Sequence, residues 1–393
     1  MPFRRADAPR RFLVRLAAAT FISVLATAAV ILAVFDRTNE LYLLEIDRLL
    51  HDDSILWGPL FQQDVAIWHL NRAAIKHPDV MVVGSSRVTQ FRDAMLPGTH
   101  FYNASLSASS PWDAEAYFRT LYTVHKPKLA LLGIDSWWFD ATRDPKFPPR
   151  ATLSWHFSPT EQVAALLRQA NDIRALGEMI TTRLDLAPDP IGRRVPVGYN
   201  AAAKASGFRA DGSYQYGAIL LDRYPLYDRA GMGFRNGFRH ERAQVQGTVG
   251  RFGYAGPPSQ LAAETLRRIV HFHRDAGVEL VLFFPPFAHA VYAEIQANPA
   301  QRKYFDEITR LVRQIAAEEN VEFHDFHDYA KLGAEDSQTI DGLHVDEIGA
   351  LAQLRTMVAA KGALARVITP EARRAMDALV ATRHTINKHL VAP

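Results

Sequence analysis

The feature that most constrains this chain is an uncharged apolar stretch near its start. Residues 16–35 read LAAATFISVLATAAVILAVF, about 20 residues without a charge, which as a helix is long enough to cross a hydrocarbon layer of about 30 Å. A cluster of arginines precedes the stretch, whereas Asp36 and Glu40 follow it. The positive-inside rule then places the N-terminus in the cytoplasm. We expect a single-pass inner-membrane protein whose remaining residues lie on the periplasmic or extracytoplasmic side.

A cleaved signal peptide is the alternative for this stretch. Ala26-Thr27-Ala28 has the small residues of a cleavage site. The apolar run is longer than a usual signal core and continues past that site, which favours a retained anchor.

The composition excludes several classes of function. Of the 393 residues, 48% are hydrophobic and 22% are charged, as in an ordinary globular protein. The net charge of +3 is too small to indicate nucleic-acid binding. The absence of cysteine excludes thiol catalysis, disulfides and cysteine–zinc sites. We expect no cofactor.

Short apolar runs that alternate with helical patterns predict the fold class. Strands are expected at 79–83, 100–103, 128–139, 277–287 and 321–326, with helices at 111–125, 260–276, 290–319 and 346–361. This alternation is typical of a mainly parallel sheet with helices on both faces. We therefore expect an α/β protein, a three-layer α/β/α sandwich around a five-stranded sheet, preceded by one transmembrane helix.

The same patterns divide the chain. A basic tail and anchor occupy 1–36, a connector helix 37–77, and the α/β domain 78–369 with an insertion at about 141–258. A basic helix is expected at 370–393. The insertion begins with a helical pattern at 159–183, and its later part is rich in Gly, Arg and Tyr. That later part is expected to be an ordered loop, a lid or a glycan-contacting surface.

Two polar motifs lie at the ends of predicted elements. Gly84-Ser85-Ser86 follows the first strand, where a tight turn exposes a serine hydroxyl in front of a helix N-terminus. Asp341 and His344 precede the predicted helix at 346–361. An aspartate three residues before a histidine can hold one imidazole nitrogen while the other faces a serine. In isolation, each motif is equally compatible with an ordinary turn or a surface pair.

Taken together, four blocks resemble the SGNH (GDSL-like) hydrolase superfamily. They are similar to its membrane-anchored envelope branch, which includes alginate O-acetylation proteins and the D-alanine transfer protein of teichoic-acid operons. The blocks are Gly84-Ser85-Ser86, residues 102–107, residues 132–135 and residues 341–344. The resemblance covers 79–140 and 277–361 and implies a flavodoxin-like SGNH fold.

The resemblance also implies roles for individual residues. Ser86 is the expected nucleophile, His344 the base and Asp341 its orienting partner. Ser107 stands where the family has a glycine that donates a backbone N–H. Asn103 belongs to the same block and is expected to lie at the oxyanion or substrate. Asp135 replaces the family's asparagine and cannot donate to an oxyanion unless protonated, so it is expected either to be structural or to bind substrate hydroxyls. The backbone N–H groups of Ser86 and Ser107 would then form the oxyanion hole. Each such donor typically stabilises the transition state by about 3 kcal/mol.

Further residues are expected near this site. Trp137 follows the third strand and would stack on a sugar ring or pack in the core. His289 follows the fourth strand and would contact substrate from the rim. His324 and His327 lie beside aspartates, but a metal site is not expected there.

The implied function is that of an SGNH-type serine acyl esterase or O-acyltransferase on a cell-surface polysaccharide. The family resemblance implies an integral-membrane acyltransferase as partner. The first alternative is a catalytically inactive SGNH-like accessory subunit that binds glycan or the acyltransferase. A sugar-binding structural protein of a secretion complex is the second.

Overall fold

The structure is a computed structural model that describes residues 7–38, 40, 42–60, 65–147, 149–158, 160, 194–217, 233–254 and 256–381. The expected helix at 159–183 and the end of the expected C-terminal helix, 382–393, lie outside the described residues, apart from residue 160.

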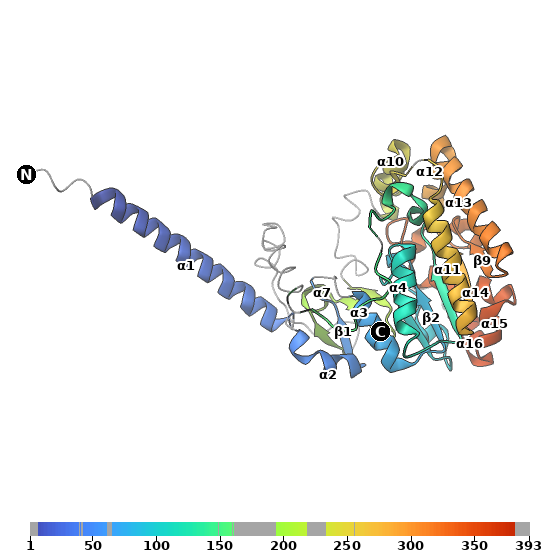
Figure 1. Cartoon of the computed structure of the whole chain (residues 1–393), viewed down its shortest axis with the longest axis horizontal. Coiled ribbons are helices and arrows are strands. Elements are labelled where there is room, and N and C mark those ends of the chain that lie inside the picture. Colours follow the sequence, from blue (N-terminus) through green and yellow to red (C-terminus); the bar gives the residue numbers. More distant parts are fainter. Residues whose placement is uncertain are drawn as a thin grey trace, which may run out of the picture.

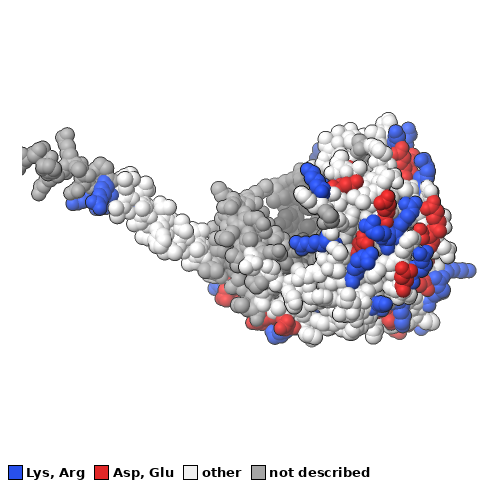
Figure 2. Space-filling model, in the orientation of Figure 1, with Lys and Arg blue, Asp and Glu red and all other residues white. Residues whose placement is uncertain are grey.

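The N-terminal apolar stretch lies in one long helix, α1 (Asp7–Arg37). Its segment Arg10–Ala29 is apolar and long enough to span a membrane, and none of that segment is buried against the rest of the chain. Figure 1 shows α1 projecting away from the other elements. Figure 2 shows basic side chains at its start and an uncharged surface beyond them.

A five-stranded parallel sheet forms the centre of the fold. Its strands are β2 (Val80–Val83), β3 (Phe101–Ala104), β4 (Leu129–Gly133), β8 (Glu279–Phe284) and β9 (Glu322–Asp325). They are arranged in the order β3-β2-β4-β8-β9, and every neighbouring pair is parallel. The five strands and the α/β class predicted from the sequence are confirmed.

Side chains alternate along these strands between two hydrophobic clusters. Met81 and Val83 belong to one cluster and Val80 and Val82 to the other. The first cluster includes residues of α3 (Val65–Lys76), α4 (Pro111–Leu121), α11 (Gln260–Ala276), α12 (His289–Ala297) and α13 (Pro299–Glu318). The second includes residues of α14 (Glu347–Ala359), α15 (Ala363–Val367) and α16 (Pro370–Ala381). Both sheet faces are therefore buried, as the continuous apolar runs indicate.

A second, smaller sheet was not predicted. It consists of β1 (Ile55–Trp57), β5 (Val195–Val197), β6 (Ser206–Phe208) and β7 (Tyr214–Tyr216), in the order β5-β1-β6-β7. A short helix, α7 (Tyr199–Lys204), lies between β5 and β6 in the chain. Figure 1 places this sheet between α1 and the main sheet.

The interpretation of 37–77 as a connector helix is therefore only partly correct. The segment contains a 3₁₀ turn (Tyr42–Glu45), α2 (Ile46–His51) and α3, but β1 interrupts them. Trp57 of β1 is fully buried and stacks on Trp68 of α3, with ring centroids 4.4 Å apart. The partner strand β5 lies in the insertion, so no local pattern reveals this strand.

Candidate functional site

The turn after β2 distinguishes the two neighbouring serines. Ser86 begins a 3₁₀ turn, Ser86–Val88, and its side chain is half-buried. Ser85 is 5% exposed, and its hydroxyl accepts the backbone N–H of Arg87 at 3.2 Å. Ser85 therefore caps the turn, whereas Ser86 presents its hydroxyl at the carboxyl edge of the sheet.

Ser86, His344 and Asp341 form a continuous hydrogen-bonded chain. Ser86 Oγ lies 2.8 Å from His344 Nε2, and His344 Nδ1 lies 2.7 Å from Asp341 Oδ2. With Asp341 ionised, Nδ1–H donates to the carboxylate and Nε2 is left to accept the serine proton. The geometry expected of these three residues is present.

The loop at 341–344 holds this geometry locally. Asp341 Oδ1 also accepts the backbone N–H groups of Leu343 and His344, at 3.0 and 2.8 Å. Burial by itself would raise the pKa of the Asp341 carboxyl, but the His344 imidazole and these N–H groups hold the pKa well below its usual range. Asp346, by contrast, caps α14 by accepting the Gly349 N–H at 3.0 Å.

Asp135 is held by Arg87, a residue for which the sequence motifs predicted no role. Its side chain is 0% exposed, and its Oδ1 accepts from Arg87 Nη1 at 3.3 Å. Burial raises the pKa of Asp135 to about 6, partly offset by the Arg87 guanidinium. The proposed contact between Asp135 and substrate is not supported, because this carboxylate is enclosed and paired.

Arg87 fastens the serine turn to the histidine loop. Its guanidinium donates to the carbonyl groups of Leu343, Pro285 and Pro286, at 3.2, 2.7 and 2.8 Å. It also lies 4.0 Å from the centre of the Phe287 ring. Arg87, the residue after Ser86, thus hydrogen-bonds both to the loop that carries His344 and to the segment that follows β8.

Asn103 has a structural position as well. Its side-chain amide donates to the Val88 and Phe91 carbonyls at 2.8 and 2.9 Å, and its oxygen accepts the Ser105 N–H at 2.9 Å. Because Asn103 is 0% exposed, a contact with substrate is not supported. Its bonds to Val88 and Phe91 instead fix the segment that follows Ser86.

Ser107 lies on the loop next to the serine turn. Leu106 before it has a φ of 60°, and the Ala108 N–H after it donates to the Gly84 carbonyl at 3.2 Å. Ser107 itself is 4% exposed. The loop that was expected to supply an oxyanion donor is therefore bonded directly to the Ser86 turn.

Trp137 and His289 are tied to other groups. Trp137 is half-buried in a 3₁₀ turn, Ser136–Phe139, and donates to the Ser109 carbonyl at 3.2 Å. His289 begins α12, and its Nδ1 lies 3.0 Å from Asp328 Oδ1, a hydrogen bond that raises the pKa of His289. A contact of Trp137 or His289 with substrate stays a prediction. Among the described residues, no group of three or more His, Asp or Glu side chains is arranged to hold a metal.

The insertion reaches the site from two directions, which the sequence did not specify. Tyr216 of β7 has its hydroxyl 3.3 Å from Thr89 Oγ1, and Thr89 donates to the Ser86 carbonyl at 2.9 Å. From the other side, Arg251 has Nη1 3.9 Å from Asp341 Oδ2. In the sequence, only the high Gly, Arg and Tyr content of the insertion indicated that it could contact the site.

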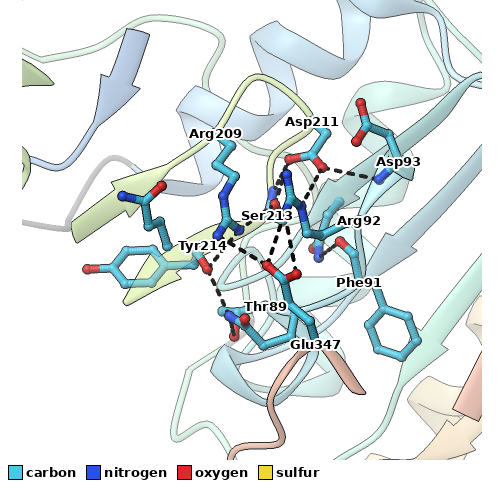
Figure 3. A network of polar contacts seen from close by, with 12 residues as sticks. Thr89, Phe91, Arg92, Asp93, Arg209, Asp211, Ser213, Tyr214 and Glu347 are labelled. Carbon is cyan, nitrogen blue, oxygen red and sulfur yellow. Dashed lines mark hydrogen bonds and ion pairs between the residues drawn. The ribbon is translucent and has the colours of Figure 1, made fainter. Parts of the chain in front are cut away.

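A buried ionic network joins the insertion to the segments that carry Ser86 and His344 (Figure 3). Glu347, the first residue of α14, is 0% exposed and lies 3.2 Å from Arg92 and 3.2 Å from Arg209. Arg92 also lies 3.9 Å from Asp211, whose Oδ1 accepts the Ser213 hydroxyl at 2.6 Å. Since Arg92 follows the serine turn and Glu347 follows His344, the network braces both sides of the site.

Comparisons with known protein families, with curated proteins and with solved structures find no match to this chain.

Proposed function

We propose that this protein is a membrane-anchored SGNH-type serine acyl esterase or O-acyltransferase. The observation that carries the proposal is the hydrogen-bonded chain from Ser86 through His344 to Asp341. The strand order supports an SGNH-type three-layer fold, because numbering the five strands along the chain gives 2-1-3-4-5, as in flavodoxin-like proteins. In such sheets ligands bind at the carboxyl ends of the strands, where Ser86 lies.

The proposed reaction has two steps. Ser86 Oγ attacks the acyl carbonyl carbon while its proton passes to His344 Nε2, and His344 then returns the proton to the departing oxygen. The developing negative charge is stabilised by the backbone N–H groups of Ser86 and Ser107. Water or a sugar hydroxyl next attacks the acyl-serine and gives its proton to His344, which protonates Ser86 Oγ as it leaves.

The proposed substrate is a cell-surface polysaccharide, which either loses an acyl group to Ser86 or accepts one from the acyl-serine. Helix α1 is apolar enough to anchor the chain, and the arginines at its start favour a cytoplasmic N-terminus. The α/β domain would then act in the periplasm or outside the cell. An integral-membrane acyltransferase that brings the acyl group across the bilayer is the proposed partner.

One observation favours the alternative, a catalytically inactive accessory subunit. Asp135 stands where the SGNH family has an asparagine, and it is buried against Arg87 rather than available to an oxyanion. Such a subunit would bind glycan or the acyltransferase without forming an acyl-serine.

Labelling with a fluorophosphonate probe separates the two functions. The probe reacts with an activated serine, so we expect the full chain to be labelled and the Ser86→Ala variant to remain unlabelled. A folded wild-type protein that is not labelled, and that does not hydrolyse a small aryl acetate, contradicts the enzymatic function and favours the accessory subunit.

A further inference from the structure

Arg251 reaches the triad from the insertion and makes its ion contact there with Asp341. Its Nη1 lies 3.9 Å from Asp341 Oδ2, the oxygen that accepts from His344 Nδ1. The guanidinium side chain is 57% exposed, whereas that of Asp341 is 3% exposed. An ion pair between two exposed side chains contributes little free energy. Here one partner is a buried carboxylate, whose electric field is only weakly screened by water.

The backbone around Arg251 holds this approach in place. Arg251 belongs to the 3₁₀ turn Gly250–Phe252, and its N–H donates to Gln244 Oε1 of α10 (Arg239–Gly247) at 2.9 Å. Gly250 has a φ of +59°, and a Cβ there would meet Gln244 Oε1 at 2.5 Å. Phe252, which follows, is 1% exposed in the main hydrophobic cluster. The turn is thus anchored on both sides of Arg251.

Other charged or titratable groups also act on Asp341 and His344, and their charges are balanced or absent near neutral pH. Arg87 is paired with Asp135. Burial raises the pKa of Tyr216 far above neutrality, so this phenol is uncharged. Glu241 of α10 is 3% exposed, and burial together with the Asp341 charge raises its pKa to about 8, so it is mostly neutral at pH 7. Arg251 therefore adds a positive charge that these neighbours do not cancel.

We propose that Arg251 is a positioning residue that sets the working pH range of the triad by sharing the charge of Asp341. The inference rests on the proposed function. Because the Asp341 carboxylate stabilises the imidazolium form of His344, a cation beside that carboxylate disfavours the imidazolium. His344 then stays available as a base at lower pH than it would without Arg251. The insertion would thereby control the acidic limit of the reaction.

The test compares the pH dependence of kcat/KM for an uncharged aryl acetate in the full chain and in Arg251→Gln. We expect the acidic limb of the profile to move to higher pH by about half a pH unit or more in Arg251→Gln, since one charge near a partly buried carboxylate is removed. Arg251→Lys keeps the charge and is expected to restore most of the wild-type limb. The difference should shrink in about 1 M salt, where screening acts over about 3 Å.

Arg239→Gln is the matched control. It removes the same charge from the same segment, but Arg239 is exposed and its guanidinium bonds Asn236 Oδ1 at 3.2 Å. We expect its profile to coincide with that of the wild type. An unshifted acidic limb in Arg251→Gln, or an equal shift in Arg239→Gln, overturns the inference.

A second measurement does not depend on activity. In the Ser86→Ala background, the pH midpoint of the His344 ring resonances, followed by NMR, should rise when Arg251→Gln is added. If the wild type lacks esterase activity but this midpoint rises, the proposed function fails and the electrostatic inference stands. If the wild type is active and the midpoint does not move, the inference alone fails.

Discussion

Ser86 Oγ lies 2.8 Å from His344 Nε2, although the two residues are 258 positions apart in the chain. The contact exists because β2 and the loop before α14 end at the same edge of the parallel sheet. Arg87 secures it by donating to the Leu343 carbonyl at 3.2 Å. A serine and a histidine from opposite ends of the domain are thereby held in reach for proton transfer.

Replacement of the two serines should have unequal effects. In Ser86→Ala, we expect hydrolysis of an aryl acetate to fall about a thousandfold or more, because a triad without its nucleophile retains only residual catalysis. Ser85→Ala removes a cap on the Arg87 N–H and a hydrogen bond to the Asp135 carboxyl, but no contact with His344, so it should cost much less. Steady-state kinetics on both purified variants checks this, and the reverse order of effects would assign the nucleophile to Ser85.

Asp341→Asn should impair the reaction while leaving the fold intact. An amide can present N–H to His344 Nδ1 and so favour the wrong tautomer, which in a comparable triad lowers the rate by about ten-thousandfold. We expect a loss of kcat/KM of roughly three to four orders of magnitude at neutral pH. Asp346→Asn is the control, since asparagine also caps helices well and Asp346 bonds Gly349 rather than His344. Equal activity of Asp341→Asn and wild type would argue against the triad.

Asp135→Asn should change how stability depends on pH. Burial raises the pKa of Asp135 to about 6, so its contribution to stability is fully present below the unfolded-state value near 4 and is lost as pH rises through about 6. The wild type should therefore lose about 3 kcal/mol of unfolding free energy relative to Asp135→Asn between about pH 4 and pH 6. Above that range the difference should level off. Denaturant unfolding at a series of pH values measures this, and parallel curves for the two proteins would refute it.

Glu347→Gln should destabilise the fold strongly. Glu347 is 0% exposed and faces the guanidinium groups of Arg92 and Arg209, which would lose their buried carboxylate. The expected cost is about 3–5 kcal/mol of unfolding free energy. The matched control is Glu279→Gln, which breaks an exposed ion pair with Arg366 and should cost about 1 kcal/mol or less. Chemical denaturation of both variants compares them, and similar small losses would show that the network is not needed for stability.

The N-terminal helix should keep the protein in the membrane fraction. Its Arg10–Ala29 segment is apolar, and none of it is covered by the rest of the chain, so water is an unfavourable environment for it. We expect the full chain to resist carbonate extraction and a reporter fused after Pro393 to lie outside the cytoplasm. Deletion of residues 1–36 should release the domain into the soluble fraction. A mature protein that begins near Val30 would instead indicate a cleaved signal peptide.

The sequence by itself determined the five central strands and the local part of the site. The strands β2, β4 and β8 are short apolar runs that end in a turn, a signal carried by neighbouring residues alone, whereas β9 is mostly polar and half-buried. Asp341 and His344 are three positions apart, so one tight loop suffices to bring the carboxylate to Nδ1. The proximity of Ser86 could also be inferred, since the carboxyl ends of parallel strands share one edge of a sheet.

Only the tertiary structure decided which distant groups surround these residues. The β1 strand has three residues and pairs with β5 far along the chain, so no periodic pattern revealed it. The pairing of Arg87 with Asp135, and the approach of Tyr216 and Arg251 from the insertion, depend on how separate segments fold onto the same edge. Such contacts are set by packing in three dimensions, whereas sequence patterns report mainly the structure of consecutive residues.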